Sequence, residues 1–207
     1  MTFDLALKMA HRSNYRCTDT EYQLMWNIVI DQPLSGKLSV VEIGSFMGAS
    51  STILGLAARK RGWPLICYDA WATHERFTDK REYEMAHTDT DHCNLFNEWI
   101  KQMTTVGLYP DYVTPIVGDS ALSGLTVTPN LPCAVCLIDG GHTTPQPLRD
   151  ISTFKRLVCS GGYMLIHDAD RMDVNLAIIN GLQLDHEWMP IQAWNGHENR
   201  IEVYQKL

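Results

Sequence analysis

The chain has 207 residues, of which 45% are apolar, and its formal net charge is -7. This length suits one substantial hydrophobic core and is short for two, so we expect a single domain over residues 1–207. The negative charge disfavours nucleic acid as a partner, because binding to phosphates needs clustered Lys and Arg. Since no apolar run approaches the roughly 18 residues of a membrane span and the N-terminus lacks the apolar core of a signal peptide, we expect a cytoplasmic protein with no membrane partner.

The six cysteines are scattered along the chain, mostly inside or beside apolar stretches. This distribution is typical of reduced, buried thiols rather than of a disulfide framework. Only Cys133 and Cys136 have the spacing of metal ligands, and no second such pair is present to complete a zinc site. We therefore interpret them as part of a core strand.

The chain alternates between helix-like and strand-like segments. A capping box at Thr18 and Glu21 predicts the start of a helix and leaves residues 1–17 as an N-terminal extension. The basic run before Gly62 has the composition of a solvated helix end. The patterns predict strands at 38–43, 64–68, 112–117, 134–138 and 163–166, and helices at 49–61, 91–106, 145–159 and 173–180. Gly161 and Gly162 are expected to end the helix at 145–159 before the strand at 163–166 begins.

This alternation predicts a doubly wound α/β fold, in which a parallel sheet has helices on both faces. The tail differs, because residues 187–193 and 200–205 are strand-like and flank Asn195 and Gly196, a hairpin signal. We expect these two strands to be antiparallel and to lie at one edge of the sheet.

Polar residues follow the predicted strands, at the edge where a sheet of this kind binds its ligands. They are Glu42 with Gly44 and Gly48, Asp69, Asp119 with Ser120, Asp139 with His142, and His167 with Asp168. The loop Gly-Ser-Phe-Met-Gly at 44–48 lacks one glycine of a dinucleotide-binding loop, and Glu42 just before it would repel a diphosphate. A cationic ligand would be accepted there.

The segment VVEIGSFMGASS at 40–51 resembles motif I of class I S-adenosylmethionine (SAM)-dependent methyltransferases, particularly the small-molecule O-methyltransferases. The resemblance covers about residues 20–205. It continues through YDAW, IVGDS and, most specifically, LIDGGHTTPQPLRDI with GGYMLIHD, which is similar to a group that contains sugar and antibiotic-tailoring enzymes. It implies a Rossmann-like, mostly parallel sheet of seven strands that ends in an antiparallel hairpin.

The resemblance also implies a set of contacts with SAM. Glu42 and Gly44 would meet the amino-acid part of the cofactor, and Asp69 would bind the ribose. The other implied contacts are Ser45, Phe46, Gly48 and Ser50 along the cofactor, Asp119 and Ser120 at the adenine, Trp71 as a stacking surface, and Asp139. Each has a structural alternative: Glu42 as a strand-end charge, Asp69 as a turn residue, Trp71 as core and Asp119 as a helix cap.

Methylation of a hydroxyl on a small polar acceptor, of sugar or natural-product type, requires removal of a proton. In one route Asp139 and Asp168 hold Mg²⁺. Related metal-dependent enzymes have an Asn where this chain has Ala169, so Asp170 or His142 would complete the metal site. In the other route His142 or His167 is the general base, since imidazole titrates near neutrality.

Residues 70–94 form a long polar loop after the second strand and are expected to be a lid that recognises the acceptor. The residues before Thr18 are candidates to pack on a neighbouring subunit, so a homo-oligomer is one arrangement open to the chain. Two other functions remain open at this point: an NAD(P)-dependent oxidoreductase and a non-catalytic cofactor-binding protein.

Overall fold

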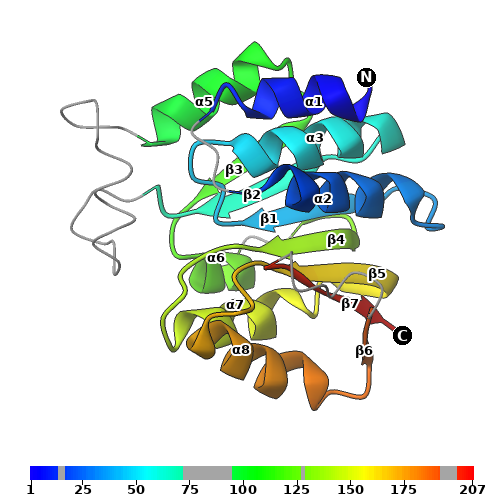
Figure 1. Ribbon diagram of the computed structural model, residues 1–207, viewed down its shortest axis with the longest axis vertical. Helices are drawn as coiled ribbons and strands as arrows, with labels where there is room; N and C mark the ends of the chain where they lie inside the picture. Colours follow the sequence, from blue (N-terminus) through cyan, green and yellow to red (C-terminus); the bar gives the residue numbers. More distant parts are fainter. Residues whose placement is uncertain (14–16, 72–94, 127–128, 192–199) are drawn as a thin grey trace.

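A computed structural model describes residues 1–13, 17–71, 95–126, 129–191 and 200–207. Its strands form one seven-stranded sheet in the order β3-β2-β1-β4-β5-β7-β6 (Figure 1). The neighbours from β3 to β5 are parallel, whereas β7 is antiparallel to both β5 and β6. The strands are β1 (Ser39–Ile43), β2 (Leu65–Asp69), β3 (Val113–Val117), β4 (Cys133–Ile138), β5 (Val158–Ile166), β6 (Trp188–Pro190) and β7 (Glu202–Lys206). The predicted mostly parallel sheet with a terminal antiparallel pair is confirmed.

Helices cover both faces of this sheet (Figure 1). One face carries α1 (Phe3–Ala10), α2 (Asp19–Asp31), α3 (Ala49–Arg61) and α5 (Leu95–Thr105), and the other carries α6 (Ser120–Thr126), α7 (Gln146–Phe154) and α8 (Met172–Ile178), which continues into a π-helical turn at Ile179–Gln183. Each face has its own buried apolar cluster. The doubly wound, Rossmann-like architecture is therefore confirmed, and it places the carboxyl ends of β1 to β5 along one edge.

Helix ends follow the local signals in the sequence. Thr18 and Glu21 form a complete capping box, and α3 ends at Gly62, whose φ of 70° is left-handed. The interpretation of the basic run as solvated is wrong for one residue, Arg61, which is half-buried and donates from its guanidinium to the carbonyls of Ile30 and Gln32. The Arg61 side chain therefore links the end of α3 to the C-terminal end of α2.

The prediction for residues 145–163 is wrong. Helix α7 ends at Phe154, and Gly161 and Gly162 lie inside β5 rather than breaking a helix before it. Between the pairs Cys133–Val158 and Val135–Tyr163 the register with β4 shifts, and the glycines lie in that bulge. Gly161 has a φ of 78°, and a Cβ on Gly162 would lie 3.0 Å from the carbonyl oxygen of Ala134. Glycine is needed there because backbone passes close to backbone.

The N-terminal extension contains a helix that the sequence pattern did not reveal. Helix α1 packs against α3 of the same chain, so its apolar face is used within the subunit. Cys133 and Cys136 are fully buried in β4, as expected for core residues. The greater part of the expected lid, 72–94, and the hairpin turn at 195–196 lie outside the described residues. None of the helices in the described part of the chain has both the length and the apolar character needed to cross a membrane.

Candidate active site

The loop after β1 closes onto the end of β4. Gly44 has a φ of 85°, and its amide donates to the carbonyl of Tyr68 at 2.9 Å. A Cβ at Gly44 would lie 1.9 Å from the carbonyl oxygen of Asp139, so no larger residue fits without moving the backbone. This close approach brings the glycine loop and Asp139 to the same point of the sheet edge.

Glu42 lies beneath that loop and is fully buried. Its Oε2 accepts hydrogen bonds from the hydroxyls of Ser45, at 2.7 Å, and Ser51, and from the thiol of Cys67 at 3.2 Å. Its Oε1 is buried with no hydrogen-bond partner among the described residues. Burial raises the pKa of Glu42, although the hydroxyl groups around it, with Ser50 first among them, act in the opposite direction. Glu42 is therefore not the exposed strand-end charge that was its structural alternative.

Asp69 connects the loops after β1 and β2. Its carboxylate accepts the amide protons of Phe46 at 2.8 Å and Trp71 at 2.6 Å, two residues whose φ values of 46° and 38° are left-handed. Burial raises the pKa of Asp69, and the nearby charge of Asp139 raises it further. The predicted ribose ligand is therefore also the residue that holds two strained backbone positions.

The Trp71 ring packs in the core. Its centroid lies 5.0 Å from that of Phe96 and 5.2 Å from that of Trp99, and its Nε1 donates to the Phe46 carbonyl at 2.8 Å. Only 8% of the residue is exposed. The structure thus agrees with the core alternative for Trp71 and does not present its ring as an open stacking surface. Gly48 precedes α3 with a φ of 91°, and Ser50 is buried in the first turn of that helix.

The loop after β3 lies beside Asp69, because the amide of Gly118 donates to the Asp69 carbonyl at 2.9 Å. Asp119 precedes α6, and its Oδ1 accepts the amide proton of Leu122 at 3.0 Å, which is the helix-cap role weighed as its alternative. Ser120 is 9% exposed, and its hydroxyl donates to Asp150 at 2.5 Å.

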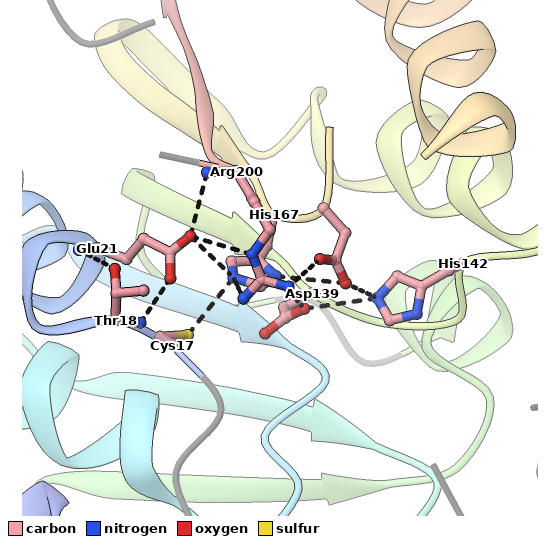
Figure 2. A network of polar contacts seen from close by, with 8 residues as sticks. Cys17, Thr18, Glu21, Asp139, His142, His167 and Arg200 are labelled. Carbon is pink, nitrogen blue, oxygen red and sulfur yellow. Dashed lines mark hydrogen bonds and ion pairs between the residues drawn. The ribbon is translucent and has the colours of Figure 1, made fainter. Parts of the chain in front are cut away.

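Four of the predicted residues converge where β4 and β5 end (Figure 2). His142 Nε2 lies 3.1 Å from Asp168 Oδ2 and 3.7 Å from Asp139 Oδ1. His167 Nδ1 lies 3.1 Å from Asp139 Oδ1 and 3.6 Å from Asp168 Oδ2. Asp168 has a φ of 52°, a left-handed value that turns the chain directly after the strand. The structure therefore brings these four predicted residues together at one point of the sheet edge.

Three further members were missed. Cys17 Sγ and Glu21 Oε1 each lie 3.6 Å from His167 Nε2, and Arg200 Nη1 lies 2.7 Å from Asp168 Oδ1 (Figure 2). The Arg200 amide also donates to Glu21 Oε1 at 3.1 Å. No local signal could have predicted these contacts, since the capping box already explained Glu21 and a hairpin flank explained Arg200.

The charges of this cluster are mutually compensating. Burial by itself would lower the pKa of His167, but Asp139 beside it outweighs burial and raises that pKa far above the ordinary value. Although burial opposes the shift, His167 lowers the pKa of Asp168 to about 2 and that of Asp139 below its usual range. The raised pKa favours the protonated form of His167, which is 3% exposed, and this makes His167 a poor candidate for the base.

Two groups of donor atoms among the described residues are compact enough to hold a metal ion, with all members within 4.8 Å of one another. One is Asp139, His142 and Asp168, and the other is Cys17, Asp139 and His167. Asp170 is exposed and belongs to neither group, so of the two residues predicted as a third ligand it is His142 that lies with Asp139 and Asp168.

Comparison with known proteins identifies the architecture. The family model described as a methyltransferase domain matches residues 41–169. A solved O-methyltransferase, TomG from Streptomyces achromogenes in complex with SAM, has 12% identity and a TM-score of 0.64, with 99% of this chain and 88% of that chain covered. A putative O-methyltransferase from Klebsiella pneumoniae has 12% identity and a TM-score of 0.65 over 99% and 89%. A TDP-rhamnose 3'-O-methyltransferase of calicheamicin biosynthesis has 14% identity and a TM-score of 0.60 over 90% and 77%.

Proposed function

This chain belongs to the methyltransferase-domain family, and on that premise we propose that it transfers a methyl group from SAM to a hydroxyl of a small polar molecule, of the sugar or natural-product type. Its structural neighbours include O-methyltransferases, one of them solved with SAM and another that acts on TDP-rhamnose. Family membership disfavours the oxidoreductase alternative, as does the glycine loop, which is one glycine short for a dinucleotide.

The observation that carries the proposal is the convergence of Asp139, His142 and Asp168 beside the glycine loop. A sulfonium cofactor is positively charged, and the carboxylates of Asp69 and Asp139 lie close enough to interact electrostatically. The donor methyl would therefore meet the acceptor near the end of β4. Holding the two reactants in line there can lower the activation free energy by roughly 7 to 11 kcal/mol in favourable cases.

We assign His142 as the general base. With its proton on Nε2, which faces Asp168 Oδ2 at 3.1 Å, the ring has its basic lone pair on Nδ1. Asp168 would orient the imidazole and stabilise the imidazolium that forms once it takes the hydroxyl proton. The remaining oxygen of Asp168 is already bound by Arg200 at 2.7 Å, which holds the carboxylate in place.

A divalent cation such as Mg²⁺ is the alternative means of activation. The donors Asp139, His142 and Asp168 fit such an ion in type and in mutual distance, although an imidazole among them suits a transition metal better than Mg²⁺. When bound, the ion would lower the pKa of the acceptor hydroxyl. In that case His142 would be a ligand, and the acceptor proton would leave to solvent.

Cofactor binding is tested first. We expect S-adenosylhomocysteine to raise the thermal unfolding midpoint and NAD to leave it unchanged, because a ligand stabilises only the state that binds it. Stabilisation by NAD alone would overturn the proposal.

The base is tested next, with release of S-adenosylhomocysteine measured over a panel of sugar nucleotides and phenols. For any acceptor found, His142→Gln should lower kcat about 10²- to 10⁴-fold while the Kd of S-adenosylhomocysteine stays within about twofold. The matched control is His186→Gln, since His186 is exposed and lies outside the cluster. Full activity of His142→Gln would exclude His142 as the base.

A further inference from the structure

A second buried carboxylate, Asp150 on α7, lies outside the Asp139 cluster and is fully buried. Its Oδ1 accepts the hydroxyl proton of Ser120 at 2.5 Å and a proton of Gln146 Nε2 at 3.0 Å. The same Gln146 nitrogen donates to the Ser120 hydroxyl oxygen at 3.1 Å. The three side chains form a closed triangle that fixes the start of α6 on the start of α7.

The other oxygen of Asp150 points toward the loop after β4. A Cβ on Gly140, the neighbour of Asp139, would lie 3.1 Å from Asp150 Oδ2, and this oxygen is buried with no hydrogen-bond partner among the described residues. Asp150 thus touches the loop after β3 with one oxygen and abuts the loop after β4 with the other. These are the loops that carry Asp119 and Asp139.

Such a carboxylate is unfavourable for stability. Burial and the nearby charge of Asp119 together raise the pKa of Asp150 to about 6, although the hydrogen bonds from Ser120 and Gln146 and the charge of Arg149 act in the opposite direction. A buried oxygen without a partner carries its full desolvation cost. An apolar side chain would fill this space without the desolvation cost of a buried carboxylate. The presence of an acid therefore points to a function that needs the hydrogen bonds among Asp150, Ser120 and Gln146.

We propose that Asp150 is a positioning residue for the methyl donor, holding Ser120 and the loop after β3 against Asp69 while supporting Gly140 beside Asp139. The identity of the ligand rests on the proposed function. Because Gly118 donates to the Asp69 carbonyl at 2.9 Å, a loop fixed by Asp150 is fixed next to the expected ribose site.

One consequence concerns the predicted role of Ser120. Its hydroxyl donates its single proton to Asp150, so it has none left for a cofactor. Ser120 would therefore present its backbone to the adenine end of the donor, and its side chain would act through Asp150. Loss of this triangle should weaken donor binding much more than it slows turnover at saturating donor.

The test uses Asp150→Asn, which keeps the shape and one acceptor oxygen but removes the charge that strengthens the hydrogen bonds from Ser120 and Gln146. Isothermal titration should show a Kd for S-adenosylhomocysteine about tenfold or more above that of the wild type, consistent with a hydrogen bond to a charged group. The KM for SAM should rise in parallel, while kcat changes by less than about threefold. The control is Asp185→Asn, since Asp185 is a partly buried carboxylate that pairs with Lys155 at 2.7 Å, at the C-terminal end of α7; this variant should bind S-adenosylhomocysteine as the wild type does.

Ser120→Ala and the double variant of Asp150→Asn with Ser120→Ala decide whether Ser120 acts through Asp150 or contacts the methyl donor directly. If the two side chains act as one unit, Ser120→Ala weakens binding to a similar extent, and the double variant is no weaker than Asp150→Asn. Additive losses, or an unchanged Kd in either single variant, would overturn the proposal. If circular dichroism shows that Asp150→Asn is not folded, Ser120→Ala, Gln146→Leu and their double variant supply an equivalent double-mutant cycle. A wild-type protein that does not bind S-adenosylhomocysteine would refute the proposed function, whereas normal binding by Asp150→Asn would refute only this inference.

Discussion

Replacement of Glu21 by Gln tests the charge balance of the buried cluster. Glu21 is fully buried, and its carboxylate accepts the amide protons of Thr18 at 2.7 Å and Arg200 at 3.1 Å. It also lies 3.6 Å from His167 Nε2 and 3.5 Å from Arg200 Nε. Gln has one acceptor oxygen, so it can keep the bond from the Thr18 amide and with it the helix cap, while its NH2 group faces the Arg200 amide. The substitution therefore removes the negative charge and one of the two hydrogen bonds.

The expected magnitude follows from the pKa of this group. Burial would raise the pKa of Glu21, but hydrogen bonds with His167 and Thr18 outweigh burial and lower it from 4.5 to about 2. At about 1.36 kcal/mol per pKa unit, this difference corresponds to roughly 3 kcal/mol of folding free energy. Because the folded-state pKa is the lower one, that stability is present above pH 4.5 and is lost as the pH falls through about 2.

Urea unfolding of the wild type and Glu21→Gln at two pH values measures the effect. We expect the variant to be about 3 kcal/mol less stable at pH 7, and the difference to fall to roughly half that value at pH 3. Glu98→Gln is the control, since Glu98 is a partly exposed helical residue whose carboxylate lies 3.4 Å from Lys101 Nζ, a surface pair worth at most about 1 kcal/mol. A difference between wild type and Glu21→Gln that stays constant across this pH range would refute the view that the carboxylate charge is what stabilises the cluster.

Three further predictions concern other parts of the molecule. Gly44→Ala places a Cβ 1.9 Å from the Asp139 carbonyl oxygen and should lower the free energy of unfolding, measured in urea, by more than about 3 kcal/mol. Gly36 has a φ of 97° but open space around it, so Gly36→Ala should lower the free energy of unfolding by only about 1 kcal/mol. Arg61→Met should cost about 1 to 3 kcal/mol through its lost carbonyl partners, and Lys60→Met, at an exposed position, less than about 1 kcal/mol. EDTA should leave the rate of methyl transfer within about twofold of the untreated rate, because His167 and Arg200 already balance the charge of the cluster carboxylates. A large loss of activity that Mg²⁺ or Mn²⁺ restores would show that a metal ion, and not His142, activates the acceptor.

The sequence by itself determined the order of the strands, the helices after β1, β2, β4 and β5, the start of α2, both ends of α3, the tight loop at Gly44 and the presence of acids and histidines where the strands end. These features depend on short-range physics: hydrophobic periodicity, capping and the backbone freedom of glycine act within a few residues. Parallel strands then bring their carboxyl ends to one edge, so Asp69, Asp139 and Asp168 could be grouped before their coordinates were known.

Only the tertiary structure decided which partners those residues have. His167 meets Cys17 across 150 positions of sequence and Arg200 meets Glu21 across 179, distances over which no local pattern carries information. The same holds for the backbone crowding at Gly162, which turned an expected helix break into a strand bulge, and for the bond from Ser120 to Asp150. Burial and the charges that packing brings together set the pKa of each group, and both depend on the whole packed chain, so the raised pKa of His167 could not have been deduced from composition or spacing.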